Sequence, residues 1–214
     1  MEDKRIRPNK RDKQKLKTRL KLLHSTVDLI AKEGFDGVTM SKVTRKANLS
    51  RGMCNYHFET KEQLMIEAFR LVYNEHETTW RGILGDLGLH PVERMKKLIT
   101  ALLSPPIAEN NKLAVWLAYW GVSSTRQIYF DICEEIDREY ENAIEDVLRE
   151  ISGGDERVNG MALHTIAVCL TGIIDGLGIQ FIISPGQLTP EDAISSCRAY
   201  LSSFFHEFKE QPNT

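Results

Sequence analysis

Apolar side chains recur at helical spacing through almost the whole sequence, and no alternating strand pattern persists. The first such stretch covers about residues 13 to 32, where aliphatic residues are separated by four or three positions: Leu16, Leu20, Leu23, Val27 and Ile30. This spacing places them on one face of a helix. Glycine and proline are scarce within these stretches and gather between them. The pattern predicts an all-α protein.

Breaks between the periodic stretches divide the chain into about nine expected helices. They lie near residues 13–32, 41–47, 51–57, 62–84, 91–103, 111–124, 126–151, 156–183 and 190–209. Gly34 is placed to end the first helix. The starts of later helices are indicated by Thr39 or Ser41, by Ser50, by Asp155 and by Thr189 before Pro190. No internal repeat is present.

Length and composition fit an ordinary soluble globular protein: 214 residues, 42% hydrophobic and 27% charged. No apolar run approaches the ~20 residues needed to cross a bilayer, and the N-terminus lacks the apolar core of a secretory signal. Four cysteines lie far apart without CxxC or Cys/His ligand spacing: Cys54, Cys133, Cys169 and Cys197. We therefore expect a cytoplasmic protein with reduced thiols, no membrane partner, no metal site and no cofactor.

The net charge of −2 hides a division along the chain. Residues 1–61 hold 16 lysines and arginines against 7 acids, whereas residues 62–214 hold 12 against 23. This asymmetry indicates a basic module that meets a polyanion, joined to an acidic body. We expect a basic arm at 1–12, a DNA-binding domain at 13–61 and a second domain at 62–214.

Residues 41–57 have the form of a helix-turn-helix, in which two short helices flank a tight turn at 48–50. The second helix of this motif enters the major groove of DNA. Gly52 leaves room for close approach to the DNA. On this helix, three side chains are of types that contact base edges: Arg51, Met53 and Asn55. Other residues offer donors to phosphate oxygens: Thr39, Ser50, Tyr56, His57 and Lys61. Taken singly, each of these residues is better explained by packing, so the array as a whole carries the prediction.

That array resembles the signature of the TetR family of bacterial one-component repressors. The matching residues are Thr39, Ser50, Gly52, His57, Phe58, Lys61 and Leu64. Two residues depart from the family pattern: Cys54 replaces a usual Leu or Ile, and Asn55 replaces a usual Tyr. The first is a conservative core change, and the second puts the operator sequence in doubt. Ahead of the motif, Arg5 and Arg7 either insert into a minor groove or belong to a disordered tail.

An aromatic stripe marks the acidic body, because Trp116, Tyr119 and Trp120 fall on one helical face. Such stripes are usually core. Together with a carboxylate they also form cages for quaternary ammonium groups through cation–π attraction. Nearby residues supply further aromatic surface and candidate acids: Tyr129, Phe130, Asp131, Glu134 and Glu135.

The segments "VWLAYWGVSSTRQIYFDICEEIDREYENAI" and "IIDGLGIQFIIS" are similar to the C-terminal half of BetI-type regulators. That subgroup represses genes of choline uptake and oxidation and responds to choline. The resemblance implies a small cationic effector, with choline as the leading identity.

The last two expected helices, near 156–183 and 190–209, are apolar enough to form a homodimer interface as a four-helix bundle. The second helix would contribute Ile194, Cys197, Leu201, Phe204, Phe205 and Phe208. Burial within one subunit is the alternative. TetR-like proteins dimerise here, and two reading heads match a palindromic double-stranded operator, which favours the dimer.

The leading hypothesis is a homodimeric repressor that a small, choline-like ligand releases from DNA. A DNA-binding or adaptor protein with a filled sensor domain is the alternative. An enzyme is disfavoured because the six histidines are scattered and no nucleophile, zinc or phosphate-loop motif occurs.

Overall fold

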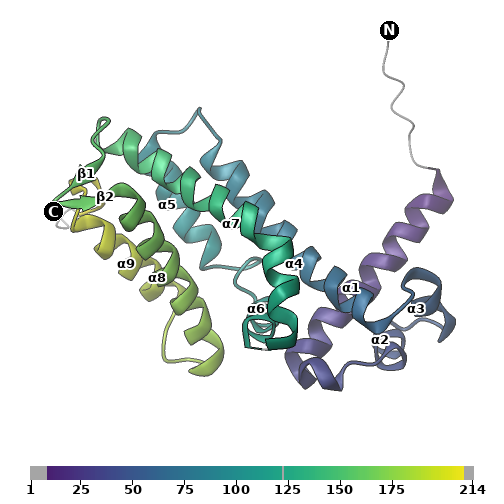
Figure 1. Ribbon diagram of the computed structural model, residues 1–214. Helices are drawn as coiled ribbons and strands as arrows, with labels where there is room; N and C mark the ends of the chain where they lie inside the picture. Colours follow the sequence, from purple (N-terminus) through teal and green to yellow (C-terminus); the bar gives the residue numbers. More distant parts are fainter. Residues whose placement is uncertain (1–8, 122, 210–214) are drawn as a thin grey trace, which may run out of the picture. The chain divides into compact units, whose positions relative to one another are not determined.

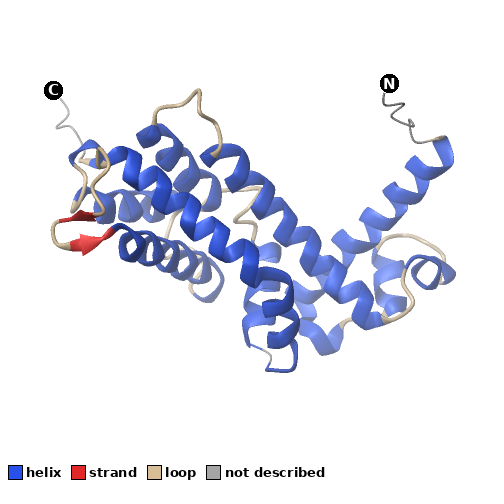
Figure 2. Cartoon of the chain, turned by 45° about the horizontal axis from the view of Figure 1, so that its top comes forward, coloured by secondary structure: helices blue, strands red, loops and turns tan. Residues whose placement is uncertain are grey.

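The computed structural model describes residues 9–121 and 123–209, and that part of the chain contains nine α-helices. Figure 2 shows that helices make up almost all of it, with one short β-hairpin. The predicted all-α fold is confirmed. Two compact units divide at Leu71 and Val72, within a helix. The domain boundary expected at 61/62 coincides with the start of that helix.

The N-terminal unit consists of three helices and the beginning of a fourth: α1 (Lys10–Gly37), α2 (Met40–Lys46), α3 (Gly52–His57) and α4 (Lys61–Leu84). Its core is formed by residues that the helical spacing placed inward, among them Leu23, Val27, Val43 and Leu64. The exception is Leu16, which is 57% exposed. The first turns of α1 therefore lie outside the core of this unit.

Helix α1 begins and ends differently from the prediction. Asn9 caps its start, since its side-chain oxygen accepts a hydrogen bond from the Asp12 N–H at 2.9 Å. Residues 10–12, expected in the arm, are thus helical, whereas Arg5 and Arg7 lie outside the described residues. Gly34 has φ +69°, a backbone conformation that favours glycine, and it breaks the helical path before three more residues complete α1.

The C-terminal unit contains the remainder of α4 and eight further elements. These are α5 (Pro91–Leu102), α6 (Asn110–Gly121), α7 (Ser123–Ile151), β1 (Arg157–Val158), β2 (Met161–Ala162), α8 (Leu163–Ile183), α9 (Pro190–Ser202) and the 3-10 helix η1 (His206–Phe208). Helix α8 packs against α7 on one side and α9 on another, as Figure 1 shows. Thr189 and Asp192 form a capping box at the start of α9, as the Thr-Pro sequence predicted.

The expected helix start at Asp155 is wrong. Residues Arg157–Ala162 form a two-stranded antiparallel hairpin, and α8 begins only at Leu163. Asn159 and Gly160 form its turn with φ of +49° and +82°. The Asn-Gly pair favours such two-residue turns because both residues adopt positive φ at low cost. The Asn-Gly pair indicated the hairpin in the sequence, but the helical periodicity around it obscured this signal.

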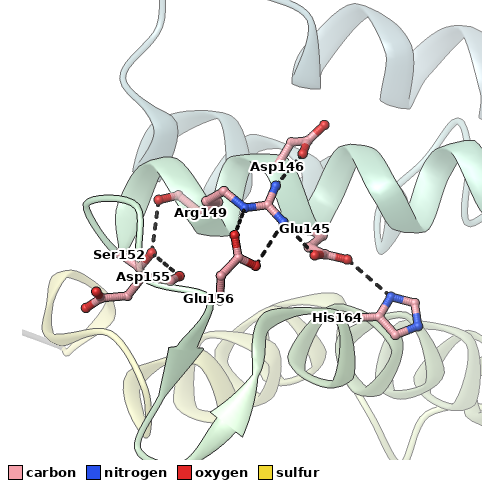
Figure 3. Close-up of polar contacts among 7 residues, drawn as sticks. All are labelled: Glu145, Asp146, Arg149, Ser152, Asp155, Glu156 and His164. Carbon is pink, nitrogen blue, oxygen red and sulfur yellow. Dashed lines mark hydrogen bonds and ion pairs between the residues drawn. The ribbon is translucent and has the colours of Figure 1, made fainter.

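A polar cluster fixes the end of α7 to the hairpin and the start of α8 (Figure 3). The guanidinium of Arg149 pairs with three carboxylates at 2.6 to 3.0 Å: Glu145, Asp146 and Glu156. Glu145 also lies 3.2 Å from Nδ1 of His164 on α8. These contacts join the C-terminal part of α7 to the N-terminal end of α8.

Helix α8 is apolar around most of its circumference, yet only part of it is covered within one chain. Ile166, Ala167, Leu170 and Ile174 are buried against the neighbouring helices. The opposite face is exposed and carries mostly small or apolar residues, among them Val168, Cys169, Gly172, Gly176 and Ile183, and Asp175 is exposed as well. By length and composition alone, α8 is the one described helix that could cross a membrane. The sequence prediction missed this because Asp175 and Gln180 interrupt the apolar run.

Helix α9 turns its apolar side inward. Cys197, Leu201, Phe205 and Phe208 are each at most 4% exposed and belong to the core of the C-terminal unit. The prediction that these residues face a partner subunit is therefore wrong. Within α9 the outward side carries small residues instead: Ser195, Ser196 and Ala199.

Candidate functional site

The helix-turn-helix is built from a few well-anchored positions. Thr39 caps α2, because its hydroxyl accepts a hydrogen bond from the Lys42 N–H at 3.2 Å. The Lys42 ammonium binds Glu33 at 2.6 Å and the Gly37 carbonyl at 2.8 Å, which ties α2 to the end of α1. Asn48 adopts φ +50° in the tight turn, a conformation that asparagine tolerates better than most residues. The turn thus sets the direction of α3.

Helix α3 is held by Cys54 and Phe58, which are 0% and 1% exposed. Burial raises the pKa of Cys54 to about 11, so its thiol stays protonated and acts as a small apolar group. With these two side chains inward, the predicted base-reading side chains are left towards solvent. Arg51 and Asn55 are exposed, and Met53 is half-buried.

The N-terminus of α3 differs from the prediction in one respect. Ser50 does not cap it, because Arg51 occupies the cap position and makes no side-chain capping bond. The Ser50 carbonyl accepts from the Met53 N–H at 3.0 Å, and the exposed serine hydroxyl remains on the outside. A Cβ at Gly52 would meet no protein atom within 4 Å. The fold itself therefore does not require glycine there, in keeping with space reserved for an external partner.

Lys61 is more constrained than its predicted phosphate role implies. Its ammonium donates to the Phe35 carbonyl at 3.0 Å, which links the start of α4 to the end of α1. A lysine ammonium has three donors. This contact therefore gives Lys61 a structural role in addition to any contact with DNA.

A basic groove between α1 and α3 was not predicted. It is lined by Lys10, Arg11, Gln14, Lys15, Thr18, Met53, Tyr56 and His57. Tyr56 is 61% exposed, and the Lys15 ammonium lies 5.6 Å from its ring centroid. Assigning residues 1–12 to an arm concealed the groove, since its cations belong to the first turns of a helix.

His57 lies at the edge of this groove with a low pKa. Desolvation lowers the pKa, and the positive charges of Lys15 and Arg19 lower it further, so the ring is neutral at pH 7. Neither ring nitrogen has a hydrogen-bond partner in the described part of the chain. A neutral imidazole can donate one hydrogen bond to a phosphate oxygen.

The C-terminal unit encloses a cavity of about 250 Å³. This volume is slightly below the ~300 Å³ at which typical small-ligand pockets begin. Its wall is formed by His76, Leu102, Ile107, Leu113, Trp116, Leu117, Trp120, Asp137, Tyr140, Glu141, Thr171, Ile174, Asp175, Gly178 and Ile179. The lining therefore combines five helices, α4 to α8, with the loop after α5.

Two of the three residues in the predicted aromatic stripe line this cavity. Trp116 and Trp120 have ring centroids 6.1 Å apart, and Trp116 also contacts the ring of His76 at 5.8 Å. Tyr119 is 1% exposed and lies outside the lining, as core. The side chain of Tyr129 lies outside the described residues.

The carboxylates in the cavity wall are not the predicted ones. Asp131, Glu134 and Glu135 are exposed and do not line it, and Asp131 accepts a hydrogen bond from Gln127 at 2.8 Å. Asp137 and Glu141 of α7 and Asp175 of α8 line it instead. Positions four apart share a helical face, so Asp137 and Glu141 point to the same side of α7. The acidic helix was predictable from the sequence, but the face of it that turns inward was not.

The cavity wall strongly affects ionisation. Loss of bulk solvent raises the pKa of Asp175 to about 7, and the negative charges of Asp137 and Glu141 raise it further. Desolvation lowers the pKa of His76 to about 4, so that ring is neutral at pH 7. No lysine or arginine is among the described lining residues. This combination of acids and tryptophan faces is suited to a cation.

Comparisons with known proteins agree with this division into two parts. The family model "Bacterial regulatory proteins, tetR family" matches residues 22–68, and the model "BetI-type transcriptional repressor, C-terminal" matches residues 91–206. A Paraburkholderia phymatum protein named HTH-type transcriptional regulator BetI is 25% identical over 160 residues, 68% of this chain and 80% of the relative. A Burkholderia ambifaria protein of the same name is 22% identical over 197 residues, 86% and 91% of the two chains.

Solved structures share the fold. A transcriptional regulator from Pseudomonas aeruginosa has a TM-score of 0.70 at 22% identity and covers 93% of this chain and 92% of its own. A transcriptional regulator from Saccharomonospora viridis, solved in complex with choline, has a TM-score of 0.72 at 20% identity, with coverage of 87% and 96%. The motif, the fold and the two family matches lead to one assignment. The chain belongs to the TetR family of bacterial transcriptional regulators, with a C-terminal domain of the BetI type.

Proposed function

We propose that this regulator is a homodimeric repressor that binds a palindromic operator and is released by a small organic cation. The cavity is the observation that supports the effector: two tryptophan faces and three carboxylates surround about 250 Å³ of space within the C-terminal unit. A filled interior around Trp116 and Trp120 would instead have favoured an adaptor without an effector.

On the DNA side, Arg51, Met53 and Asn55 are the residues proposed to contact base edges. Their place on α3 and the absence of any fold requirement for Gly52 support this role. Thr39, Ser50, Tyr56, His57 and Lys61 are proposed to contact phosphates. The basic groove along α1 adds cations that would strengthen attraction to the backbone of any sequence.

The proposed dimer uses the uncovered faces of α8 and α9. The exposed side of α8 carries Gly172 and Gly176, and neither would bring an added Cβ within 4 Å of another protein atom. Small residues on adjoining helices allow two backbones to approach closely. A second copy of the same face would bury the apolar surface that one chain leaves open.

Helix α4 offers a route for coupling. It begins at Lys61, in the DNA-binding unit, and it also provides His76 to the cavity wall. A cation that binds the DNA-incompetent state more tightly than the DNA-bound state shifts the population towards release. Each tenfold difference in affinity between the states corresponds to about 1.4 kcal/mol of coupling.

Choline and its uncharged isostere 3,3-dimethylbutan-1-ol provide a matched test of this proposal. Operator duplexes would first be selected from fragments of the source genome and labelled for fluorescence anisotropy. We expect choline or another organic cation to lower the anisotropy of the bound duplex, while the neutral isostere has no effect because it lacks the charge. Equal release by both compounds would contradict a cation site. Failure to select any fragment would contradict operator binding.

A further inference from the structure

One face of α4 carries three aromatic rings, Tyr73, His76 and Trp80, at spacings of three and four residues. Tyr73 and His76 both contact the ring of Trp116 on α6, with ring centroids 5.4 and 5.8 Å apart. His76 and Trp80 both contact the ring of Tyr140 on α7, at 5.4 and 5.3 Å. Trp116 and Tyr140 line the cavity. Two rings of the cavity wall therefore each pack against two rings of α4, at separations typical of favourable aromatic pairs.

Tyr73 adds a polar contact to this face of α4. Its hydroxyl donates a hydrogen bond to Oδ1 of Asp137 at 2.9 Å and lies 3.4 Å from the Cys133 carbonyl, both on α7. The Tyr73 side chain is 2% exposed and is not among the described residues that line the cavity, whereas Asp137 and Trp116 are. Tyr73 thus contacts two lining residues from two different helices, a carboxylate on α7 and an indole ring on α6.

The position of Tyr73 along α4 is close to the boundary between the two compact units, which divide between Leu71 and Val72. Tyr73 follows directly, so its contacts fix α4 in the first turn that belongs to the C-terminal unit. The same helix begins at Lys61 in the DNA-binding unit. A change in the contacts of Tyr73 therefore acts on α4 next to the point where the helix passes from one unit to the other.

A cation in the cavity would weaken the bond between Tyr73 and Asp137. A hydrogen bond to an ionised carboxylate is about twice as strong as one between neutral groups. A cation that pairs with Asp137 offsets this charge, so the carboxylate becomes a weaker acceptor for the Tyr73 hydroxyl. The same cation would pack against Trp116, the other lining residue in contact with Tyr73.

We propose that Tyr73 is the positioning residue that transmits occupancy of the cavity to α4. Without effector, its bond to Asp137 keeps α4 in the arrangement that binds the operator, and a bound cation weakens that bond and favours release. This inference rests on the proposed function and names the contact through which its effector acts. Because coupling between two sites is reciprocal, loss of the hydroxyl should have opposite effects on operator and effector binding.

The substitution Tyr73→Phe keeps the ring and removes only the hydroxyl. Without effector, anisotropy titrations should show an operator affinity at least about threefold below that of the wild type, because the DNA-binding arrangement has lost a charge-assisted bond. Isothermal titration calorimetry of the free protein uses the cation that releases the wild type, choline or tetramethylammonium. This cation should bind Tyr73→Phe at least about threefold more tightly, because more of the population is already in the effector-binding state. A purely structural role of Tyr73 would weaken both affinities.

Two controls locate the effect. Tyr119→Phe removes the hydroxyl of another tyrosine in the C-terminal unit, 1% exposed and outside the described lining, and should change neither affinity by more than about twofold. A double-mutant cycle with Asp137→Ala tests the partner of Tyr73. Each single substitution should lower operator affinity without effector, and the double substitution should lower it no further than the stronger single one. Circular dichroism establishes that each variant is folded.

The outcomes distinguish this inference from the function on which it rests. Unchanged operator affinity in Tyr73→Phe, a parallel loss of both affinities, or additive losses in the cycle overturns the role of Tyr73 and leaves a cation-released repressor intact. A wild-type protein that binds its operator but is released by no organic cation overturns the proposed function and this inference together.

Discussion

The two units of this protein place their functional side chains in opposite ways. In the N-terminal unit, the residues proposed to contact DNA lie between Thr39 and Lys61, and most are exposed. In the C-terminal unit, the residues around the cavity run from His76 to Ile179 and come from five helices and a loop. The first unit separates its site from its core, whereas in the second three lining residues, Leu102, Tyr140 and Ile174, also belong to the core. Substitutions of exposed site residues in the first unit should therefore affect binding alone, except at Lys61, which also contacts the Phe35 carbonyl. In the second unit, substitutions of the buried lining residues should affect stability as well as binding.

The largest expected effect comes from removing the anchor of α3. Phe58 is 1% exposed and its ring packs under the Arg19 guanidinium, so Phe58→Ala should destabilise the N-terminal unit by about 3–5 kcal/mol. Operator affinity should fall by more than about 100-fold. All three tryptophans, Trp80, Trp116 and Trp120, belong to the C-terminal unit, so their fluorescence reports its unfolding alone. We expect the unfolding transition of the C-terminal unit to keep its wild-type midpoint. A shift of the tryptophan signal in parallel with loss of DNA binding would show that the units unfold together.

The next effect separates base reading from phosphate contact within the N-terminal unit. Arg51→Ala should cost about 1–3 kcal/mol and relax selectivity at one base pair. Lys61→Ala should weaken binding to all sequences and reduce the salt slope by about 1. It should also cost about 1 kcal/mol of stability, because the contact with the Phe35 carbonyl is lost. Anisotropy titrations across salt concentrations and operator variants measure both. Identical loss of specific and non-specific binding in the two variants would contradict the assigned roles.

A smaller effect is expected from the cavity wall. Trp120→Ala removes one aromatic face and should weaken the effector about 5- to 30-fold, the equivalent of a cation–π contact of ~1–2 kcal/mol. Operator binding without effector should stay within about twofold of the wild type. Trp120→Phe is the matched control, because it keeps an aromatic face and should recover part of the affinity. If Trp120→Ala abolishes operator binding as well, Trp120 is required for the fold and not only for effector binding.

The smallest expected effect is a dependence of stability on pH. Asp175 holds its proton up to a pKa of about 7 in the folded state, whereas it ionises near 4 when unfolded. The folded state then binds more protons between these values, so stability falls as pH rises and levels off above about pH 8. His76 acts in the opposite sense between about pH 4 and 6.5, because its folded pKa is lowered.

The melting temperature of the empty protein should therefore fall from pH 6.5 to pH 8, where His76 no longer contributes. Asp175→Asn should flatten this fall. A fall of the same size in the variant would assign the effect to other groups.

The helices and the DNA-binding motif were accessible from sequence because their signals are local. Thr39 at the start of α2 and Phe58 after α3 are marked by capping chemistry and by spacing within a few residues. The inward face of α7 was not accessible in this way, since many of its positions carry acids. Only packing against α8 distinguishes Asp137 and Glu141 from Asp131 and Glu135. The hairpin at Asn159 and Gly160 was missed for a different reason, because its two-residue strands are too short to show a period.

Asp175 also has a consequence for the newly made chain. It lies near the middle of α8, the described helix whose length and apolar character would suit a lipid bilayer. An aspartate at the centre of such a segment opposes insertion by ~2.5–3.5 kcal/mol on translocon scales. The residue that brings a carboxylate to the cavity wall thereby helps to direct the nascent polypeptide away from lipid before its helices have assembled.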